Sequence, residues 1–247
     1  MDALARLRAE PQRSAIFLDI DGALAPIVPR PEDSFVLEET RAVVRSLVQR
    51  YALVAAITGR ASDNARELVG VPGVVVVGLH GLELVPVDAE WHERMLSLAR
   101  GVPFRLEDKG VSVSFHYRDA ADEERAREQL ETVATRARVL GLKARFGRKV
   151  LELLPPVEVH KGTAVRALLE RAGLARALYA GDDTTDLDGF AALDGLEVGV
   201  RIAVDSPEAP PELLARADAV VDGPANHMEG SGAAEAACEP AERPHHL

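Results

Sequence analysis

The stretch AIFLDIDG, from Ala15 to Gly22, constrains the fold more than any other part of the chain. Four apolar residues lead directly into two aspartates, Asp19 and Asp21, separated by one isoleucine. Aspartates are rarely buried deeply unless they are paired or bind a metal. The pattern therefore predicts a core strand that ends where its carboxylates reach a cleft, and alternation along the strand places both on the same side.

Further apolar runs alternate with segments of helical spacing. Helices are predicted at 37–49, 62–69 and 161–173, and strands at 14–20, 52–57, 73–78, from 176 onward, within 196–204 and at 217–223. Strands that are apolar on both faces and separated by helices indicate a parallel sheet covered by helices. We therefore expect an α/β fold.

The middle of the chain has a different pattern. VSVSFHYR, residues 111–118, alternates apolar with polar side chains, as in a strand with one solvated face. A polar helix at 120–140 and two short strands at 142–146 and 149–155 are predicted to follow. We expect a second, smaller unit at 84–157, inserted between the two parts of the main unit, 1–83 and 158–247.

Composition excludes some classes of function. The 247 residues carry a net charge of −11, which disfavours nucleic-acid binding because that needs a basic face. The sequence lacks an apolar run long enough for a membrane span and a signal-peptide pattern at its start, so we expect a cytoplasmic protein. The single cysteine, Cys238, excludes an internal disulfide, and His245 and His246 are not expected to bind a metal.

Four polar motifs stand at the predicted ends of strands or the start of a helix. They are Asp19-Ile20-Asp21-Gly22, Thr58-Gly59-Arg60, Lys161-Gly162, and the run Gly181-Asp182-Asp183-Thr184-Thr185-Asp186. Each motif alone also fits a turn or a solvated capping loop. Open parallel sheets bind ligands outside the carboxyl ends of their strands, so the joint occurrence favours one shared cleft.

Carboxylates packed so closely repel one another unless a divalent cation is present, and Mg²⁺ prefers carboxylates, waters and phosphate oxygens. We expect a magnesium-assisted phosphoryl-transfer site with metal-site residues Asp19, Asp21, Asp182, Asp183 and Asp186. Asp19 would form an aspartyl phosphate, and Asp21 would act as general acid and then as general base. Lys161 would neutralise charge on the transferring group, and the Thr58 hydroxyl with adjacent backbone N–H groups would hold phosphate oxygens.

These motifs resemble the haloacid dehalogenase-like phosphatases, and within them the trehalose-6-phosphate phosphatases. The similarity covers roughly residues 14–200, in the stretches FLDIDGALAPIV, VVGLHGLEL, RLEDKGVSVSFHYR, GRKVLELLPP, HKGTAVRALL and YAGDDTTDLDGF. The resemblance implies a Rossmann-like three-layer catalytic core and a smaller α/β cap inserted after the third strand that selects the substrate.

The resemblance also implies which side chains bind the substrate. In the cap these are Glu107, Lys109, Arg118 and Glu152, with Arg148 as a further candidate; beside the cleft they are Gly59, Arg60, His80 and Gly81. The cap residues, and His116 with them, could equally be ordinary residues on the solvated face of a sheet. Two positions depart from the family pattern, Ala23 in place of the usual threonine and Leu187 in place of a glutamate.

The expected activity is therefore Mg²⁺-dependent hydrolysis of trehalose 6-phosphate to trehalose and phosphate, in trehalose biosynthesis. Two alternatives remain at this point: a phosphatase for another sugar phosphate, of the glucosylglycerate or sucrose phosphate type, and a catalytically silent module that binds sugar phosphates. A small-molecule sugar phosphate is the expected partner, without nucleic acid or membrane. The oligomeric state stays open, with a monomer favoured.

Overall fold

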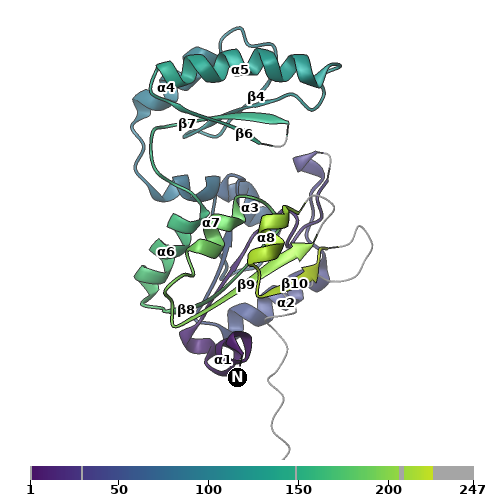
Figure 1. Ribbon diagram of the computed structural model, residues 1–247, viewed down its shortest axis with the longest axis vertical. Coiled ribbons are helices and arrows are strands. Elements are labelled where there is room, and N and C mark those ends of the chain that lie inside the picture. Colours follow the sequence, from purple (N-terminus) through teal and green to yellow (C-terminus); the bar gives the residue numbers. More distant parts are fainter. Residues whose placement is uncertain (1, 29, 148, 206–208, 225–247) are drawn as a thin grey trace, which may run out of the picture. The chain divides into compact units, whose positions relative to one another are not determined.

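The computed structural model describes residues 2–28, 30–147, 149–205 and 209–224 (Figure 1). The chain divides into two compact units. Unit 1 comprises Met1–Leu84 and Val159–Leu247, and unit 2 comprises Val85–Glu158. The catalytic and substrate-selecting roles expected for these two parts of the chain stay predictions at this stage. Arg148, Cys238, His245 and His246 lie outside the described residues.

Unit 1 is built on a parallel six-stranded sheet with the order β10-β9-β8-β1-β2-β3. Its strands are β1 (Ala15–Leu18), β2 (Leu53–Ile57), β3 (Val75–Val77), β8 (Arg176–Gly181), β9 (Val198–Asp205) and β10 (Ala219–Asp222). The predicted parallel sheet is thus confirmed. Because β1 lies between β2 and β8, its carboxyl end is next to the ends of both neighbours.

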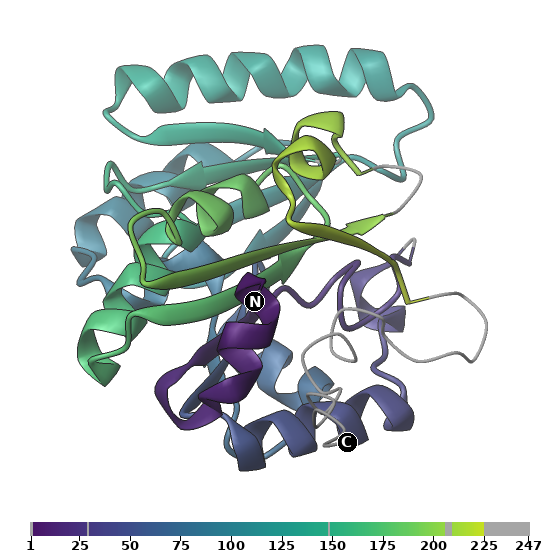
Figure 2. The ribbon, with the colours of Figure 1, turned by 60° about the horizontal axis from the view of Figure 1, so that its bottom comes forward.

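Helices cover both faces of this sheet (Figure 2). One face packs an apolar cluster with α1 (Ala3–Ala9), α2 (Glu38–Arg50) and α3 (Ser62–Val69). The other face packs a second cluster with α6 (Lys161–Ala172), α7 (Asp186–Ala191) and α8 (Pro211–Arg216). Alternate residues of β1 divide between the clusters, with Ile16 in the first and Phe17 in the second. This is the three-layer α/β arrangement that the family resemblance implies.

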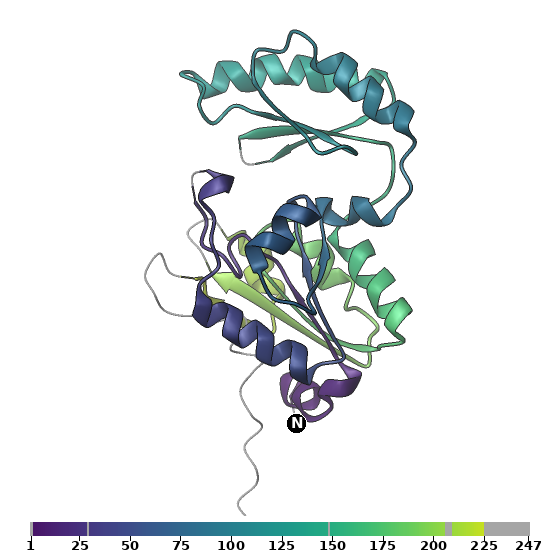
Figure 3. The same ribbon diagram turned by 180° about the vertical axis from the view of Figure 1, so that it is seen from behind.

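Unit 2 contains an antiparallel four-stranded sheet with the order β4-β5-β7-β6. The strands are β4 (Arg105–Asp108), β5 (Val113–His116), β6 (Lys143–Gly147) and β7 (Val150–Leu154), and the helices are α4 (Ala89–Ala99) and α5 (Glu123–Val139). Both helices lie on one face of the sheet, where Phe115 and Leu151 pack against Met95 and Leu130 (Figure 3). Among the described residues of this unit, no helix covers the other face.

Several helices and one strand of the structure were not predicted from the sequence. The sequence analysis did not identify α1, α4, α7, α8 or β4. It left open whether 196–204 forms one strand or two, and the structure has one, β9. β4 was missed because all four of its residues are exposed, so its sequence has no apolar alternation. In the described part of the chain, no helix is both long and apolar enough to cross a membrane.

Candidate active site

The carboxyl ends of β1 and β8 bring three aspartates together. Asp19 follows β1 and its backbone N–H donates to the Ala180 carbonyl of β8 at 2.9 Å. Asp182 follows β8, and Asp186 begins α7. One carboxylate oxygen from each aspartate lies within 4.8 Å of the others, and all three residues are buried.

Lys161, the first residue of α6, bridges two of these carboxylates. Its Nζ lies 2.8 Å from Asp19 Oδ2 and 2.6 Å from Asp186 Oδ1, with 2% of the side chain exposed. Burial by itself lowers the pKa of the ammonium, but the charges of Asp186 and Asp19 outweigh burial and raise the pKa of Lys161 above its ordinary value. Lys161 therefore stays charged at neutral pH.

Asp186 accepts four hydrogen bonds. Its Oδ1 accepts from Lys161 Nζ and from the Tyr179 hydroxyl at 2.7 Å, and its Oδ2 accepts from the backbone N–H groups of Asp182 and Asp183, both at 3.0 Å. A carboxylate with two donors on each oxygen has little capacity left for a metal. Asp186 therefore organises the loop that carries Asp182, and its predicted place in the metal site stays a prediction.

Tyr179 is a residue that the sequence analysis missed. Its side chain is fully buried in β8, and burial together with the charges of Asp186 and Asp19 raises the pKa of its hydroxyl well above the ordinary value. The hydroxyl is therefore a neutral donor at all moderate pH values. The sequence offered one signal for this residue: Tyr179 stands two residues before Gly181, where the acidic run begins. A buried tyrosine hydroxyl usually finds a hydrogen-bond partner, and the nearby aspartates could supply one.

The electrostatics of the cluster favour a bound cation. Burial raises the pKa of Asp19 well above its ordinary value; the charge of Lys161 opposes this, and the charges of Asp186 and Asp182 add to it. Three buried carboxylates thus face one ammonium. A divalent cation would remove the imbalance, and carboxylate oxygens are the ligands that hard cations prefer.

The local backbone also fits a small ion. Gly22 has φ +89°, and a Cβ built on it would lie 2.0 Å from Asp182 Oδ2. The loop after β1 therefore approaches the Asp182 carboxylate so closely that no other residue fits there. Asp19 and Asp182 are the residues that would hold a divalent metal.

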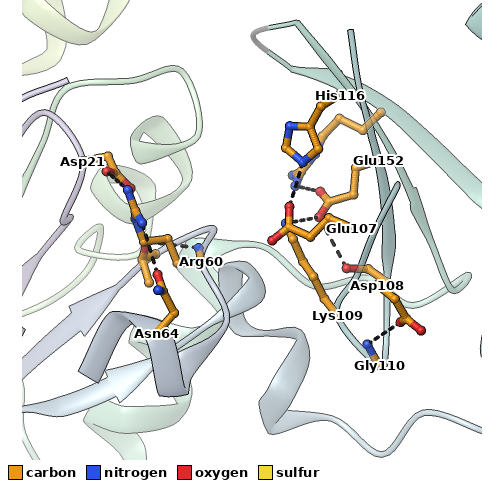
Figure 4. A network of polar contacts seen from close by, with 12 residues as sticks. Asp21, Arg60, Asn64, Glu107, Asp108, Lys109, Gly110, His116 and Glu152 are labelled. Atoms are coloured by element: carbon orange, nitrogen blue, oxygen red, sulfur yellow. Dashed lines mark hydrogen bonds and ion pairs between the residues drawn. The ribbon is translucent and has the colours of Figure 1, made fainter. Parts of the chain in front are cut away.

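Two of the five predicted metal-site residues lie outside this cluster of described residues. Asp21 is bound by Arg60 through both carboxylate oxygens, each at 2.7 Å. The Arg60 guanidinium also donates to the Pro31 carbonyl at 3.0 Å and to Asn64 Oδ1 at 3.1 Å (Figure 4). Asp183 is exposed, and its Oδ1 accepts from the backbone N–H of Thr184 at 2.6 Å.

The Thr58-Gly59-Arg60 motif packs against the loop that carries His80 and Gly81. The backbone N–H of His80 donates to the Thr58 carbonyl at 2.8 Å, and a Cβ on Gly59 would lie 2.7 Å from His80 Nε2. Thr58 is buried, and its Oγ1 accepts from the backbone N–H of Arg60 at 3.2 Å. Gly81 adopts φ +103°, which explains a glycine at this turn.

Glu83 joins these two loops and was missed by the sequence analysis. Its carboxylate accepts from the backbone N–H of Ser62 at 2.9 Å and from that of Gly78 at 3.2 Å. Glu83 belongs to the stretch VVGLHGLEL, but no role was assigned to it, because a glutamate in a loop is common on any surface.

The two residues that depart from the family pattern, Ala23 and Leu187, both pack among apolar side chains. Ala23 is fully buried in the apolar cluster on the first face of the sheet. Leu187 packs against the cluster on the second face. A buried hydroxyl at Ala23 would need a hydrogen-bond partner, so alanine suits this packing.

Unit 2 has a second polar region on the sheet face that its helices leave uncovered. Strand register aligns Glu107, Ser114, Glu152 and Arg145 across β4, β5, β7 and β6. Glu152 Oε2 accepts from Arg145 at 2.6 Å, and Glu152 Oε1 accepts from Lys109 Nζ at 3.4 Å (Figure 4). We call this face, with Glu107, Lys109, Ser114, Arg145 and Glu152, the polar sheet face.

Glu107, on the edge strand β4, also has charged partners on the polar sheet face. Glu107 lies 2.8 Å from His116 Nε2 and 4.0 Å from Lys109 Nζ. The hydrogen bond with His116 holds the pKa of Glu107 below its ordinary value, although partial burial opposes this. Arg118 is half-buried just beyond β5. Sequence reasoning missed Arg145 and Ser114. Arg145 lies outside the stretches that carry the family resemblance, and Ser114 lies within RLEDKGVSVSFHYR but fits an ordinary polar position of an alternating strand.

Comparisons with known proteins agree with one another. The profile of the trehalose-phosphatase family matches residues 17–102 and 104–212. A probable trehalose-phosphate phosphatase 2 of Oryza sativa subsp. japonica is 29% identical over 240 residues, covering 80% of this chain and 63% of the relative. The chain therefore spans less than two thirds of that relative's length.

Solved structures support the fold. The C-terminal domain of C. albicans trehalose-6-phosphate phosphatase has a TM-score of 0.74 at 21% identity, with 96% of each chain covered. A haloacid dehalogenase-like hydrolase from Bacteroides thetaiotaomicron has a TM-score of 0.64 at 14% identity, covering 85% of this chain and 94% of that one. Together with the profile match, which spans most of the chain, these findings show that the protein belongs to the trehalose-phosphatase family, within the haloacid dehalogenase-like fold.

Proposed function

We propose that this protein is a Mg²⁺-dependent phosphatase that hydrolyses trehalose 6-phosphate to trehalose and phosphate, in trehalose biosynthesis. One observation carries the proposal: Lys161 bridges Asp19 and Asp186 in a buried cluster that also contains Asp182, at the carboxyl edge of a parallel sheet. The cluster combines a candidate nucleophile, a fixed ammonium and two candidate metal ligands. The family membership supplies the reaction class.

Asp19 is the proposed nucleophile. Its carboxylate attacks the phosphorus, the bond from phosphorus to the sugar oxygen breaks, and an aspartyl phosphate forms on Asp19. Water then attacks that phosphorus and releases phosphate, which restores the carboxylate. Mg²⁺ held by Asp19 and Asp182 would supply positive charge to the phosphoryl oxygens.

Lys161 contributes a second, permanent positive charge beside the nucleophile. Its Nζ is held 2.8 Å from Asp19 Oδ2, so it lies where charge develops on the transferring group. A fixed ammonium in a buried site stabilises a phosphoryl transition state more than it would in water. Thr58, buried at the end of β2, is proposed to hold a phosphate oxygen.

Asp21 is proposed as the general acid for the leaving sugar oxygen and as the general base for the attacking water. Both of its oxygens accept from Arg60 in this structure. Proton donation therefore requires Asp21 to exchange at least one of these contacts. Asp183, Gly59, Arg60, His80 and Gly81 remain proposed site residues on the strength of the family motif.

The polar sheet face of unit 2 is proposed as the sugar-binding surface, and unit 2 as the substrate-selecting cap. Glu107, Lys109 and Glu152 present alternating charges there, and Arg118 lies just beyond β5 of the same sheet. Charged groups form strong hydrogen bonds with sugar hydroxyls, and their pairing with one another keeps the face stable without ligand. We also propose a cytoplasmic, monomeric protein.

The experiment is phosphate release across a panel of sugar phosphates, with Mg²⁺ and again with a chelator. We expect kcat/KM for trehalose 6-phosphate to exceed that for glucose 6-phosphate at least about tenfold, and chelation to abolish turnover. The Asp19→Asn protein is the matched control for contaminating phosphatases.

Each alternative predicts a different result in this panel. A higher kcat/KM for sucrose 6-phosphate or a glucosylglycerate phosphate would reassign the substrate. Equal rates with trehalose 6-phosphate and glucose 6-phosphate would refute selection of a disaccharide. Sugar-phosphate binding without any metal-dependent turnover would identify a silent binding module.

A further inference from the structure

Tyr179 is a fully buried polar side chain that the proposed mechanism does not use. It lies in the interior of β8, and its hydroxyl donates to Asp186 Oδ1 at 2.7 Å. Asp186 is the same carboxylate that holds Lys161 at 2.6 Å. Tyr179 is thus one hydrogen bond away from Asp186 and two away from Lys161.

The phenol ring is fixed by α7, the helix that begins with Asp186. A Cβ on Gly189 would lie 2.4 Å from the Tyr179 ring, so the ring occupies the space that any other residue at 189 would fill. Phe190 packs on the ring edge-to-face, with centroids 6.1 Å apart and an interplanar angle of 82°. The glycine defines the position of the ring and therefore the direction of its hydroxyl.

The hydroxyl completes the set of donors around Asp186. Two backbone N–H groups occupy Oδ2, and Tyr179 shares Oδ1 with Lys161. Without the hydroxyl, Lys161 would be the one remaining donor to Oδ1 among the residues that the structure describes. An acceptor that loses one donor attracts the remaining one more strongly, especially where water is excluded. The ammonium would then shift toward Asp186 and away from Asp19.

We propose that Tyr179 is a positioning residue of the active site: through Asp186, its hydroxyl sets where the Lys161 ammonium lies between Asp186 and Asp19. The proposal rests on the proposed function, because it assigns Lys161 a role beside the Asp19 nucleophile. Tyr179 does not touch the reacting groups. Its effect should appear in kcat, because the Lys161 ammonium is proposed to act on charge that develops in the transition state.

The test is Tyr179→Phe, which removes the hydroxyl and keeps the ring. We expect kcat to fall about tenfold, the size of a lost hydrogen bond to a charged group, with KM unchanged within about twofold. Tyr117→Phe is the matched control, because Tyr117 is also buried but lies in the apolar cluster of unit 2. Its kcat should equal that of the wild type. A Tyr179→Phe protein with wild-type kcat would overturn the proposal.

A double-mutant cycle separates action through Asp186 from a general effect on packing. We expect Tyr179→Phe to cause no further loss in the Asp186→Asn background, since the hydroxyl then has no carboxylate to orient. Losses that multiply would contradict the proposal. Phe190→Leu disturbs the ring contact and keeps the hydroxyl, so it should lower the thermal midpoint and leave kcat within about twofold of the wild type.

Two further outcomes of these experiments would also refute the role of Tyr179. If Phe190→Leu lowers kcat as much as Tyr179→Phe, packing explains the loss and the proposal fails. If Tyr179→Phe is unfolded at the assay temperature, the hydroxyl belongs to stability and the proposal fails as well. The wild-type rate on trehalose 6-phosphate reports on the proposed function, whereas the ratio of each variant to the wild type, on any phosphate ester that is hydrolysed, reports on Tyr179.

Discussion

The molecule has two polar regions in which carboxylates pair with basic side chains, and the two regions differ in how far water reaches them. In unit 1, Lys161, Asp19 and Asp186 have side-chain exposures of 2%, 8% and 0%. On the polar sheet face of unit 2, Glu107 is 48% exposed and Arg145 is 37% exposed. The first region is closed to water and the second is partly open to it.

The balance of charge differs as well. The buried cluster holds three carboxylates and one ammonium, whereas Glu107 and Glu152 on the polar sheet face are matched by Lys109 and Arg145. Surplus buried charge is costly, while paired charges near the surface cost and contribute little. The difference in charge balance supports our proposals that the buried cluster binds a cation and that the polar sheet face exchanges its partners for a ligand.

Asp19→Asn should give the largest effect, because it removes the proposed nucleophile from the buried cluster. We expect turnover to fall by at least about 10⁴-fold, the scale seen when a covalent nucleophile is deleted. The metal-free protein should gain about 1 kcal/mol in unfolding free energy, since burial, Asp186 and Asp182 already disfavour the charge of Asp19. Denaturant unfolding with and without Mg²⁺ measures this.

Asp63→Asn is the control for that stability gain. Asp63 lies on α3 with 94% of its side chain exposed. Removing its charge should change neither turnover nor metal-free stability by a measurable amount. Retained turnover in the Asp19→Asn protein would disprove the aspartyl-phosphate mechanism.

Lys161→Met should give the next largest effect and should reverse the stability result. Removing the ammonium leaves Asp19 and Asp186 buried without its charge, so we expect a loss of about 3 kcal/mol in unfolding free energy. Turnover should fall about 100-fold or more. Saturating Mg²⁺ should restore part of the stability. A variant as stable as the wild type without metal would show that the cluster is not under electrostatic strain.

Glu152→Gln tests the polar sheet face. Glu152 accepts from Arg145, Lys109 and Ser112, and we propose that it also binds the sugar. We expect kcat/KM for trehalose 6-phosphate to fall about tenfold, mainly through a higher KM. Asp108→Asn is the matched control, because Asp108 pairs with His92 of α4 instead. Equal kinetic effects in the two variants would refute the assignment of this face.

Glu107→Gln should give the smallest effect, a change in acid stability. The pKa of Glu107 is lowered by His116, so its contribution to stability is present above the unfolded-state pKa and is lost as pH falls through the folded-state pKa. Because the carboxylate is half-exposed, the contribution should be about 0.5 kcal/mol at most. The stabilities of the two proteins, measured by urea unfolding, should differ at pH 6 and converge as the pH falls through the folded-state pKa of Glu107. A constant difference across that range would contradict this account.

The sequence determines some of these features more strongly than others. Apolar runs that end in Asp19 and Asp182 predict both the parallel sheet and its reactive edge, because register then brings the two side chains together. The sequence could not reveal that Arg60 holds Asp21, since the two residues are 39 positions apart and their contact depends on the conformation of the loops.

The same reasoning explains the residues that were missed. Tyr179 and Glu83 act through hydrogen bonds to groups whose positions only the folded backbone defines. Arg145 reaches Glu152 only because β6 pairs with β7 in one particular register. Local sequence patterns predict helices, strands and where they end, whereas contacts between loops and between neighbouring strands can be identified only from the structure.

The most direct test of the central comparison is the specificity ratio, kcat/KM for trehalose 6-phosphate divided by kcat/KM for glucose 6-phosphate, measured for the wild type, Lys161→Met and Glu152→Gln. If the buried cluster performs the chemistry and the polar sheet face selects the sugar, Lys161→Met lowers both values by the same factor and leaves the ratio unchanged. Glu152→Gln then lowers the ratio by reducing only the value for trehalose 6-phosphate. A ratio that changes with Lys161→Met and stays constant with Glu152→Gln would contradict the account.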